Sequence, residues 1–132
     1  MKVKVSNATG KALDWMVANA EGATGLHFDT CATWWFTLDG KDRCLSSGWS
    51  ASQCYYPSTN WAHGGLILTR ERISRTIDHS GLWVAYWTDG VRRGDEVKEW
   101  MQCDRSELIA GLRCYVTSKL GDEVEVPEGV MQ

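Results

Sequence analysis

The side chains best equipped for chemistry lie together near the middle of the chain, in the stretch Tyr55 to Gly65 (YYPSTNWAHGG). Hydroxyl, amide, indole and imidazole groups follow one another there, and Pro57 fixes one backbone angle and biases Tyr56 toward an extended conformation. Side chains of these types stack on flat ligands and form hydrogen bonds with them. The stretch predicts a shaped loop that forms a binding surface.

Each kind of residue in and after this loop has an expected role. The indole ring can stack on a flat ligand, the hydroxyl and amide groups can orient its polar edges, and the glycine pair lets a ligand approach the backbone. Arginines just downstream can grip phosphate or carboxylate with their planar forks. The expected ligand-binding residues are Tyr56, Ser58, Thr59, Asn60, Trp61, His63, Gly64, Gly65, Arg70 and Arg72.

Two other interpretations of the loop stay open. A Pro-Ser-Thr turn can cap a helix, and Trp61 is then simply buried. A catalytic interpretation would use Cys54 or Ser58 as the nucleophile and His63 as its base, although no third residue that orients the base can be named.

Signatures of cofactor and metal sites are missing from the sequence. Neither G-x-x-x-x-G-K-[ST] nor G-x-G-x-x-G occurs, which excludes the ATPase and dinucleotide-binding functions that depend on them. The five cysteines include no C-x-x-C pair and the three histidines no H-x-x-x-H pair, so we expect no metal site and no cofactor. The acidic residues are scattered or lie near the C-terminus, and they suggest no carboxylate pair for hydrolysis.

The composition is that of one globular domain. With 132 residues, of which 43% are hydrophobic and 23% charged, the chain can bury a core. Its net charge of −3 argues against duplex nucleic acid as a partner. No apolar run could cross a membrane and no signal segment is visible, so we expect a cytoplasmic protein with reduced thiols. The eight tryptophans suit a core, a stacked ligand or an interface.

Local patterns in the first half of the chain favour one helix between strands. Apolar residues recur at helical spacing after a polar cap, and a later run of aromatic and β-branched residues ends in a hairpin turn signal. These patterns predict a strand over 2–5, a helix from Ser6 or Thr9 to Gly22, a strand over 31–38, a turn at Asp39-Gly40, a partner strand over 41–45 and a loop over 46–52.

The second half favours antiparallel strands followed by the clearest helix. An apolar stripe follows a capping-box pattern near the C-terminus, and turn formers separate the segments before it. These patterns predict a strand from about Ile73 within the ambiguous segment 66–77, a turn at 78–81, a strand over 82–88 that ends at Asp89-Gly90, a short strand within 91–103, and a helix from the Asp104/Glu107 capping box to Gly121.

Together these elements predict an α+β domain over residues 1–121. We expect an antiparallel meander sheet with an N-terminal and a C-terminal helix packed on one face. Residues 122–132 form an acidic tail that we expect to be extended or frayed. The strand over 82–88 carries large apolar side chains on both faces, so either both faces are covered or one displays an aromatic platform.

Three segments resemble a known family in the same order along the chain. The opening MKVKVSNATGKALDWMVANAEG, the loop YYPSTNWAHGG with LILTRERIS, and the close LIAGLRCYVTSKLGDEVEVPE are similar to the NinX-like phage proteins, a nin-region family of unknown function. Members usually carry Asp and Gln where this chain has Asn60 and His63, which removes a carboxylate from the loop. The loop is also similar, at a different spacing, to that of the anti-Thoeris sponge proteins.

The family resemblance implies a phage accessory protein in the bacterial cytoplasm. Combined with the loop, it leads us to expect a non-catalytic module that sequesters a nucleotide-derived ligand, in the manner of a sponge for host-defence signals. One alternative is a protein-interaction inhibitor of a host enzyme, for which tryptophan and tyrosine would be the anchors. Another is a small hydrolase or transferase. A homodimer or larger homo-oligomer would suit a sequestering protein.

Overall fold

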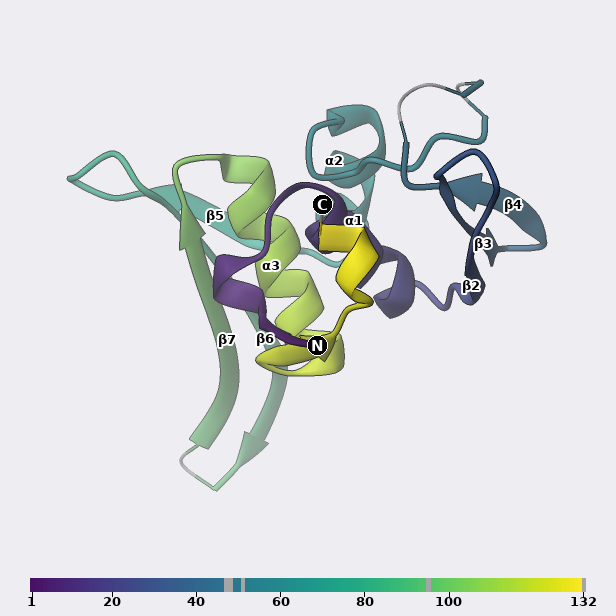
Figure 1. The fold of residues 1–132 in the computed structure, drawn as a ribbon. Coiled ribbons are helices and arrows are strands. Elements are labelled where there is room, and N and C mark those ends of the chain that lie inside the picture. Colours follow the sequence, from purple (N-terminus) through teal and green to yellow (C-terminus); the bar gives the residue numbers. More distant parts are fainter. Residues whose placement is uncertain (47–48, 51, 95, 132) are drawn as a thin grey trace.

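A computed structural model of the chain describes residues 1–46, 49–50, 52–94 and 96–131 (Figure 1). Along this described part, three α-helices are separated by groups of strands. The α-helices are α1 (Gly10–Ala20), α2 (Trp61–Arg70) and α3 (Glu107–Leu120), with short 3-10 turns η1 (Val5–Asn7) and η2 (Glu128–Met131). The strands are β1 (Lys2–Lys4), β2 (Thr24–Phe28), β3 (Trp34–Leu38), β4 (Lys41–Cys44), β5 (Ser74–Ile77), β6 (Trp83–Arg93), β7 (Glu96–Asp104) and β8 (Glu123–Glu125).

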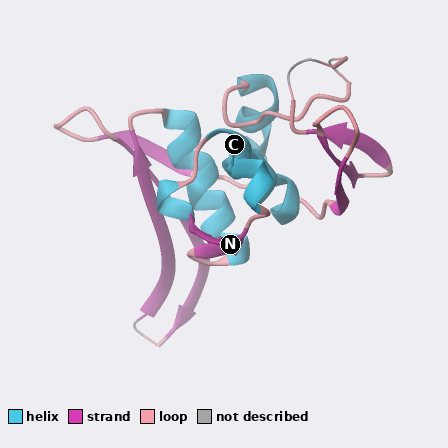
Figure 2. Ribbon diagram, in the orientation of Figure 1, coloured by secondary structure: helices cyan, strands magenta, loops and turns pink. Residues whose placement is uncertain are grey.

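The α+β class, the antiparallel pairing and the helices near both ends of the chain are confirmed. The strands of the described residues divide among separate sheets, β1-β8, β2-β3-β4 and β5-β6-β7 (Figure 2). β6 and β7 form a long hairpin that reaches away from the helices, and the β2-β3-β4 sheet lies on the opposite side of the molecule (Figure 1).

α3 is the centre of the packing. Its buried residues include Leu112, Tyr115 and Val116, and it contacts α1, α2, β6 and β7. Gly111 lies directly under the Leu68 side chain, and a Cβ added there would come within 2.5 Å of Leu68 Cδ1. The close approach of α2 and α3 therefore depends on a residue without a side chain.

The N-terminal cap of α3 differs from the one that we expected. We expected Asp104 to cap the helix, but Ser106 is the cap, because its hydroxyl accepts a hydrogen bond of 3.2 Å from the Ile109 amide. Asp104 lies two residues before this cap, and its carboxylate accepts a hydrogen bond of 2.8 Å from the Ser106 amide. Gly121 ends the helix as predicted.

β6 corrects a second expectation. The strand was predicted to end at Asp89-Gly90, yet it continues to Arg93, with a shift of register between Thr88 and Arg92. Pairing with β7 thus overrides the local turn signal, and the irregular register accommodates it. β2 was not predicted at all. The predicted turn at 78–81 and the hairpins β3-β4 and β5-β6 are confirmed.

The β5-β6-β7 sheet has one covered face. Trp83, Ala85 and Trp87 belong to the face on which α3 packs, whereas Tyr86 on the other face is 43% exposed. Met101, the cross-strand partner of Tyr86, is 62% exposed. We expected either that both faces of the strand over 82–88 are covered or that one face is exposed, and the structure shows the exposed face.

The last residues are part of the domain. β8 is extended, as we expected for this segment, but it is paired with β1 in the register Val3↔Val124. Val124, Val126 and Val130 are buried. This pairing brings the two ends of the chain together (Figure 1).

Candidate functional site

The central loop is shorter than we expected, because a helix begins inside it. Residues 57–59 form a turn, and α2 starts at Trp61. Asn60 is the N-cap, and its side-chain oxygen accepts a hydrogen bond of 3.0 Å from the Ala62 amide. The interpretation as a turn that caps a helix is therefore right for Asn60, and the interpretation of 61–65 as loop is wrong.

Trp61 is not buried, although the interpretation of the loop as a helix-capping turn expected it to be. Its side chain is 51% exposed on the first turn of α2. The ring lies over Gly65, where an added Cβ would come within 3.0 Å of Trp61 Cε3. Gly65 thus makes room for the indole on the surface of α2, and this gives it a structural role.

Gly64 has a structural role in place of the expected approach to a ligand. An added Cβ would collide with the Pro57 carbonyl oxygen and would come within 2.7 Å of Leu108 Cδ1. The residue is buried between the turn before α2 and helix α3. Its backbone therefore faces protein, and no ligand can reach it there.

His63 belongs to a cluster around Tyr55. Its Nε2 lies 3.3 Å from Arg43 Nη2, and its ring centroid lies 5.7 Å from that of Tyr55. Burial and the nearby Arg43 cation lower the pKa of His63 below its usual 6.5. The imidazole is therefore neutral at pH 7 and accepts from the guanidinium.

No described contact joins His63 to either expected nucleophile. The Cys54 thiol donates to the Trp49 carbonyl at 3.2 Å, and the Ser58 hydroxyl is buried without a hydrogen-bond partner among the described residues. The buried thiols of Cys44 and Cys114 are unreactive, since burial raises the pKa of Cys44 to about 11 and that of Cys114 to about 12. The arrangement offers no activated nucleophile.

The remaining expected residues line two hollows that share no residue. The loop pocket, of about 190 Å³, is lined by Gly10, Lys11, Asp14, Leu45, Ser46, Tyr55, Tyr56, Ser58 and Thr59. The arginine groove, of about 490 Å³, is lined by Arg70, Glu71, Arg72, Ser74, Tyr86, Trp87, Thr88 and Lys119. The structure thus separates the expected hydroxyl groups from the expected arginines.

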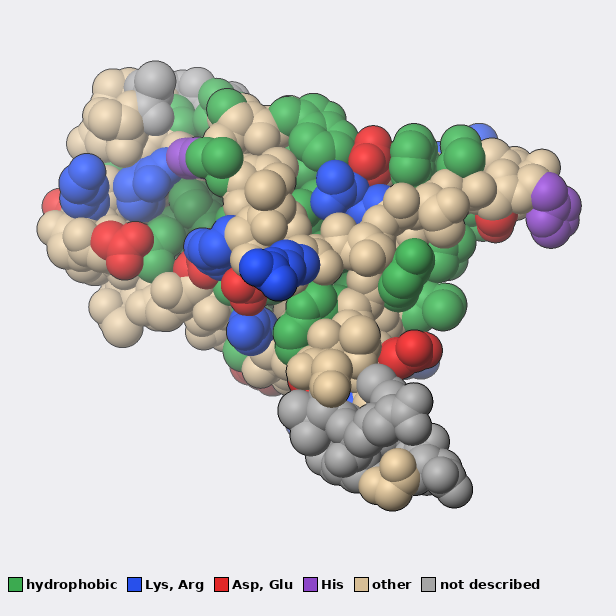
Figure 3. Space-filling model, turned by 180° about the vertical axis from the view of Figure 1, so that it is seen from behind, with side chains coloured by type: hydrophobic (Ala, Val, Ile, Leu, Met, Phe, Trp, Pro, Cys, Tyr) green, Lys and Arg blue, Asp and Glu red, His purple; other side chains and the backbone are tan. Residues whose placement is uncertain are grey.

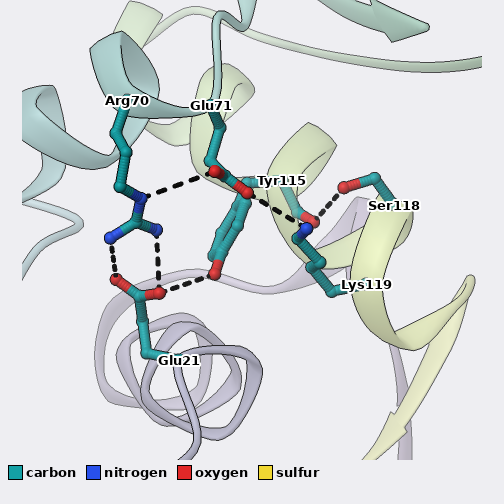
Figure 4. Close-up of polar contacts among 6 residues, drawn as sticks. All are labelled: Glu21, Arg70, Glu71, Tyr115, Ser118 and Lys119. Atoms are coloured by element: carbon teal, nitrogen blue, oxygen red, sulfur yellow. Dashed lines mark hydrogen bonds and ion pairs between the residues drawn. The ribbon is translucent and has the colours of Figure 1, made fainter. Parts of the chain in front are cut away.

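A network of ion pairs forms one side of the arginine groove (Figure 4). Arg70 makes a bidentate contact with Glu21, with N–O distances of 3.0 and 2.8 Å, and Tyr115 donates to the same carboxylate at 2.7 Å. Glu71 accepts from Arg70 at 3.4 Å and pairs with Lys119 at 3.1 Å. Two cations here are matched by two carboxylates.

Arg72 differs from these cations in its backbone and in its surroundings. It has φ +56°, in the left-handed region, and its amide bonds to the Thr69 carbonyl at 3.2 Å while the Ile73 amide bonds to Leu68 at 3.0 Å. This is the Schellman ending of a helix, in which glycine is the usual residue. The side chain is exposed and has no ion-pair partner among the described residues. The groove therefore carries one uncompensated positive charge.

Aromatic side chains form the other side of the groove. β5 begins at Ser74, opposite Tyr86, so the edge of β6 is uncovered from Trp87 onward. The Trp87 ring packs on Trp100 with centroids 5.0 Å apart and is partly buried. Figure 3 shows basic, acidic and hydrophobic side chains intermixed on the rear face of the molecule.

Six residues of the groove were not expected from the sequence: Tyr86, Trp87, Glu71, Ser74, Thr88 and Lys119. One signal pointed to the first two, namely the large apolar side chains on both faces of the strand over 82–88. Lys119 gave no signal, because its position beside Arg72 depends on how the ends of α2 and α3 meet.

Two further properties concern the described residues only. They contain no group of three or more His, Cys, Asp or Glu side chains arranged to hold a metal ion. None of their helices is long and apolar enough to span a membrane.

Comparison with known proteins identifies the family of the chain. The family model described as Bacteriophage P22, NinX matches residues 4–119. No curated protein matches the chain. The similarity of the loop to anti-Thoeris sponge proteins gains no support from these comparisons.

Proposed function

Because this chain belongs to the NinX family of bacteriophage P22, we propose that it acts in the cytoplasm of the infected bacterium as a non-catalytic binding module. Its ligand is a small nucleotide-like molecule, which the arginine groove binds through both phosphate and base. The protein sequesters this ligand and leaves it chemically unchanged, and thereby withdraws a host signal.

Arg72 is the observation that carries this proposal. A non-glycine residue in the left-handed region costs about 1 kcal/mol, and such strain is characteristic of functional positions. The structure tolerates this cost at Arg72, whose guanidinium is exposed, lies beside the arginine groove and has no ion-pair partner among the described residues. A planar, always charged fork in that place fits phosphate recognition.

The rest of the groove suits the other parts of a nucleotide. Tyr86 offers an exposed ring on which a base can stack, and the hydroxyls of Ser74 and Thr88 can bond to a sugar or to base edges. Lys119 adds a second cation that can leave Glu71 for phosphate. The volume of about 490 Å³ lies within the roughly 300 to 1,000 Å³ usual for small-molecule sites.

Isothermal titration with cyclic dinucleotides and cyclic ADP-ribose isomers tests the proposal. We expect one of them to bind and to be recovered with unchanged mass. Arg72→Gly should weaken binding at least tenfold, whereas Arg105→Ala, which removes an exposed arginine outside the groove, should not. Flat titrations throughout, or an Arg72→Gly variant that binds as wild type, would refute the proposal, and an altered mass would indicate an enzyme.

The open face of the β5-β6-β7 sheet favours a second candidate, inhibition of a host protein. Tyr86 and Met101, which are 43% and 62% exposed, could anchor such a partner. A stoichiometric host protein that is retained by the wild type and lost with Met101→Glu would favour this function over sequestration.

A further inference from the structure

The loop pocket carries a second inference, independent of the arginine groove. It lies between the first turns of α1 and the turns that precede α2. Its volume of about 190 Å³ is smaller than the roughly 300 to 1,000 Å³ that drug-sized ligands occupy. The space suits a small organic molecule.

Two buried hydroxyl groups line this pocket and have no hydrogen-bond partner among the described residues. They belong to Tyr55, which is 4% exposed, and to Ser58, which is 3% exposed. An unsatisfied buried hydroxyl costs about 1 to 3 kcal/mol, and most such groups in native proteins are paired. Two unsatisfied hydroxyl groups therefore belong to residues of the pocket wall.

Asp14 supplies a buried negative charge in the same place. The residue is 4% exposed, and its Oδ1 accepts a hydrogen bond of 2.8 Å from the Ser58 amide. Burial raises the pKa of Asp14 to about 6, so the carboxyl is mostly ionised at pH 7. No ion pair to Asp14 is found within the described residues, and Lys11 remains exposed at the rim. A buried carboxylate without a cation is costly.

The walls of the pocket fit an apolar or aromatic body. Tyr55 is buried and Tyr56 half-buried, and Leu45 adds hydrocarbon. Aromatic faces also attract a cation that lies near them. The Tyr55 ring already has the Arg43 guanidinium 5.2 Å from its centroid, so its surroundings tolerate positive charge.

We propose that the loop pocket binds a small primary ammonium compound. The ammonium group lies against Asp14 and donates to the hydroxyl oxygens of Tyr55 and Ser58, and the body of the molecule packs between the tyrosine rings. The three N–H groups of the ammonium then match three acceptors, which are the Asp14 carboxylate and the hydroxyl oxygens of Tyr55 and Ser58. The buried Asp14 carboxylate also gains a counter-ion. Lys11 at the rim meets a carboxylate or another anionic group of the ligand, if it has one.

Tyramine and its neutral alcohol analogue tyrosol provide a matched pair of probes. We expect tyramine to bind to the full chain at about pH 7.5, and tyrosol to bind at least tenfold more weakly. Asp14→Asn keeps an acceptor for the Ser58 amide and removes only the charge, so this variant should lose the preference for tyramine. Equal affinity for the two probes, no binding of either at millimolar concentration, or unchanged tyramine binding by Asp14→Asn would overturn the proposal.

The pH dependence gives a second test that needs no Asp14 variant. Tyramine affinity should fall below about pH 6, by up to tenfold per unit, as Asp14 takes up a proton. Several other charged groups lie nearby: Lys11 at the rim, Arg43 and His63 against Tyr55, and Glu21 and Tyr115 near its hydroxyl. Burial and the Arg43 cation lower the pKa of His63, so His63→Gln is the control for this histidine and should retain the profile. A flat profile would count against the ammonium site.

The two sites can be told apart in one experiment. Arg72→Gly should bind tyramine as wild type does, and Asp14→Asn should bind nucleotides as wild type does. If Arg72→Gly alone abolished tyramine binding, the ammonium would be binding in the arginine groove and the assignment to the loop pocket would be wrong.

Discussion

Arg72 holds at the end of α2 the backbone position that Gly22 holds at the end of α1. Both have positive φ, +56° and +99°. The bonds that follow are equivalent, because Ile73 bonds to Leu68 at 3.0 Å and Ala23 bonds to Ala18 at 2.9 Å. Both helices therefore have a Schellman ending, which α1 forms with the favoured glycine and α2 forms with a strained arginine.

Exchanging these two residues should have opposite effects on stability. Arg72→Gly should raise the free energy of unfolding by about 0.5 to 1 kcal/mol, because it relieves the left-handed strain. Gly22→Arg should lower it by about 1 kcal/mol. Urea denaturation measures both. A loss of stability in Arg72→Gly would mean that the arginine side chain supports the fold, and its proposed role in binding would lose its main argument.

Neighbouring glycines of α2 should respond differently to alanine. Gly64→Ala places a methyl group against the Pro57 carbonyl and 2.7 Å from Leu108 Cδ1, so we expect a loss of about 2 kcal/mol or more. Gly65→Ala meets only the exposed Trp61 ring, which can move, and gains helix propensity of up to about 1 kcal/mol. The melting temperatures of the two variants should therefore lie on opposite sides of that of the wild type. Similar losses in both would contradict the packing described for Gly64.

Stability should fall as Asp14 ionises. Its pKa is about 6 in the folded chain and 3.8 as the reference value, so the folded state retains a proton that the unfolded state releases between these values. The contribution of Asp14 is fully present below about pH 4 and is lost as pH rises through about 6, up to about 3 kcal/mol. Denaturation of wild type and Asp14→Asn at several pH values should show this difference, and parallel curves would show that the carboxyl is not desolvated.

Glu21 should be the most sensitive carboxylate of the ion-pair network. It accepts from both Arg70 and Tyr115, and Tyr115 is 1% exposed. Glu21→Gln should cost about 1 to 3 kcal/mol, because a buried phenol loses its charged acceptor, and Tyr115→Phe about 1 kcal/mol. The control is Glu125→Gln, since that carboxylate is exposed and pairs with the N-terminus, and we expect almost no change. A double-mutant cycle should find Glu21 and Tyr115 coupled.

Local patterns were enough to predict those elements that depend on neighbouring residues. The apolar stripe of α3 and the Asp39-Gly40 turn are examples, since helix periodicity and turn chemistry act over a few residues. Asp89-Gly90 carries the same kind of signal but lies inside β6, because pairing with β7 overrides it. Thr88 pairs with Glu99 and Arg92 with Val97, so the pairing depends on residues that lie outside the two-residue turn signal.

The candidate sites were predicted only in part for a related reason. Arg72, Tyr56 and Ser58 were expected to bind, but their division between two hollows follows from α2 beginning at Trp61. The cap at Asn60 was a usable signal for that helix. The meeting of Glu21 with Arg70, and of Lys119 with Glu71, depends on three helices coming together, and no spacing along the chain encodes it.

The pairing of β1 with β8 sets the order in which this domain can be completed during its synthesis. The first strand is synthesised before its neighbour and can pair with it only once residues 123–125 have also left the ribosome. α1 and α3, which form much of the interior, are likewise far apart along the chain. The nascent polypeptide therefore cannot form the β1-β8 pair until β8 has emerged, and a ribosome that stalls before β8 would hold a chain without this pair.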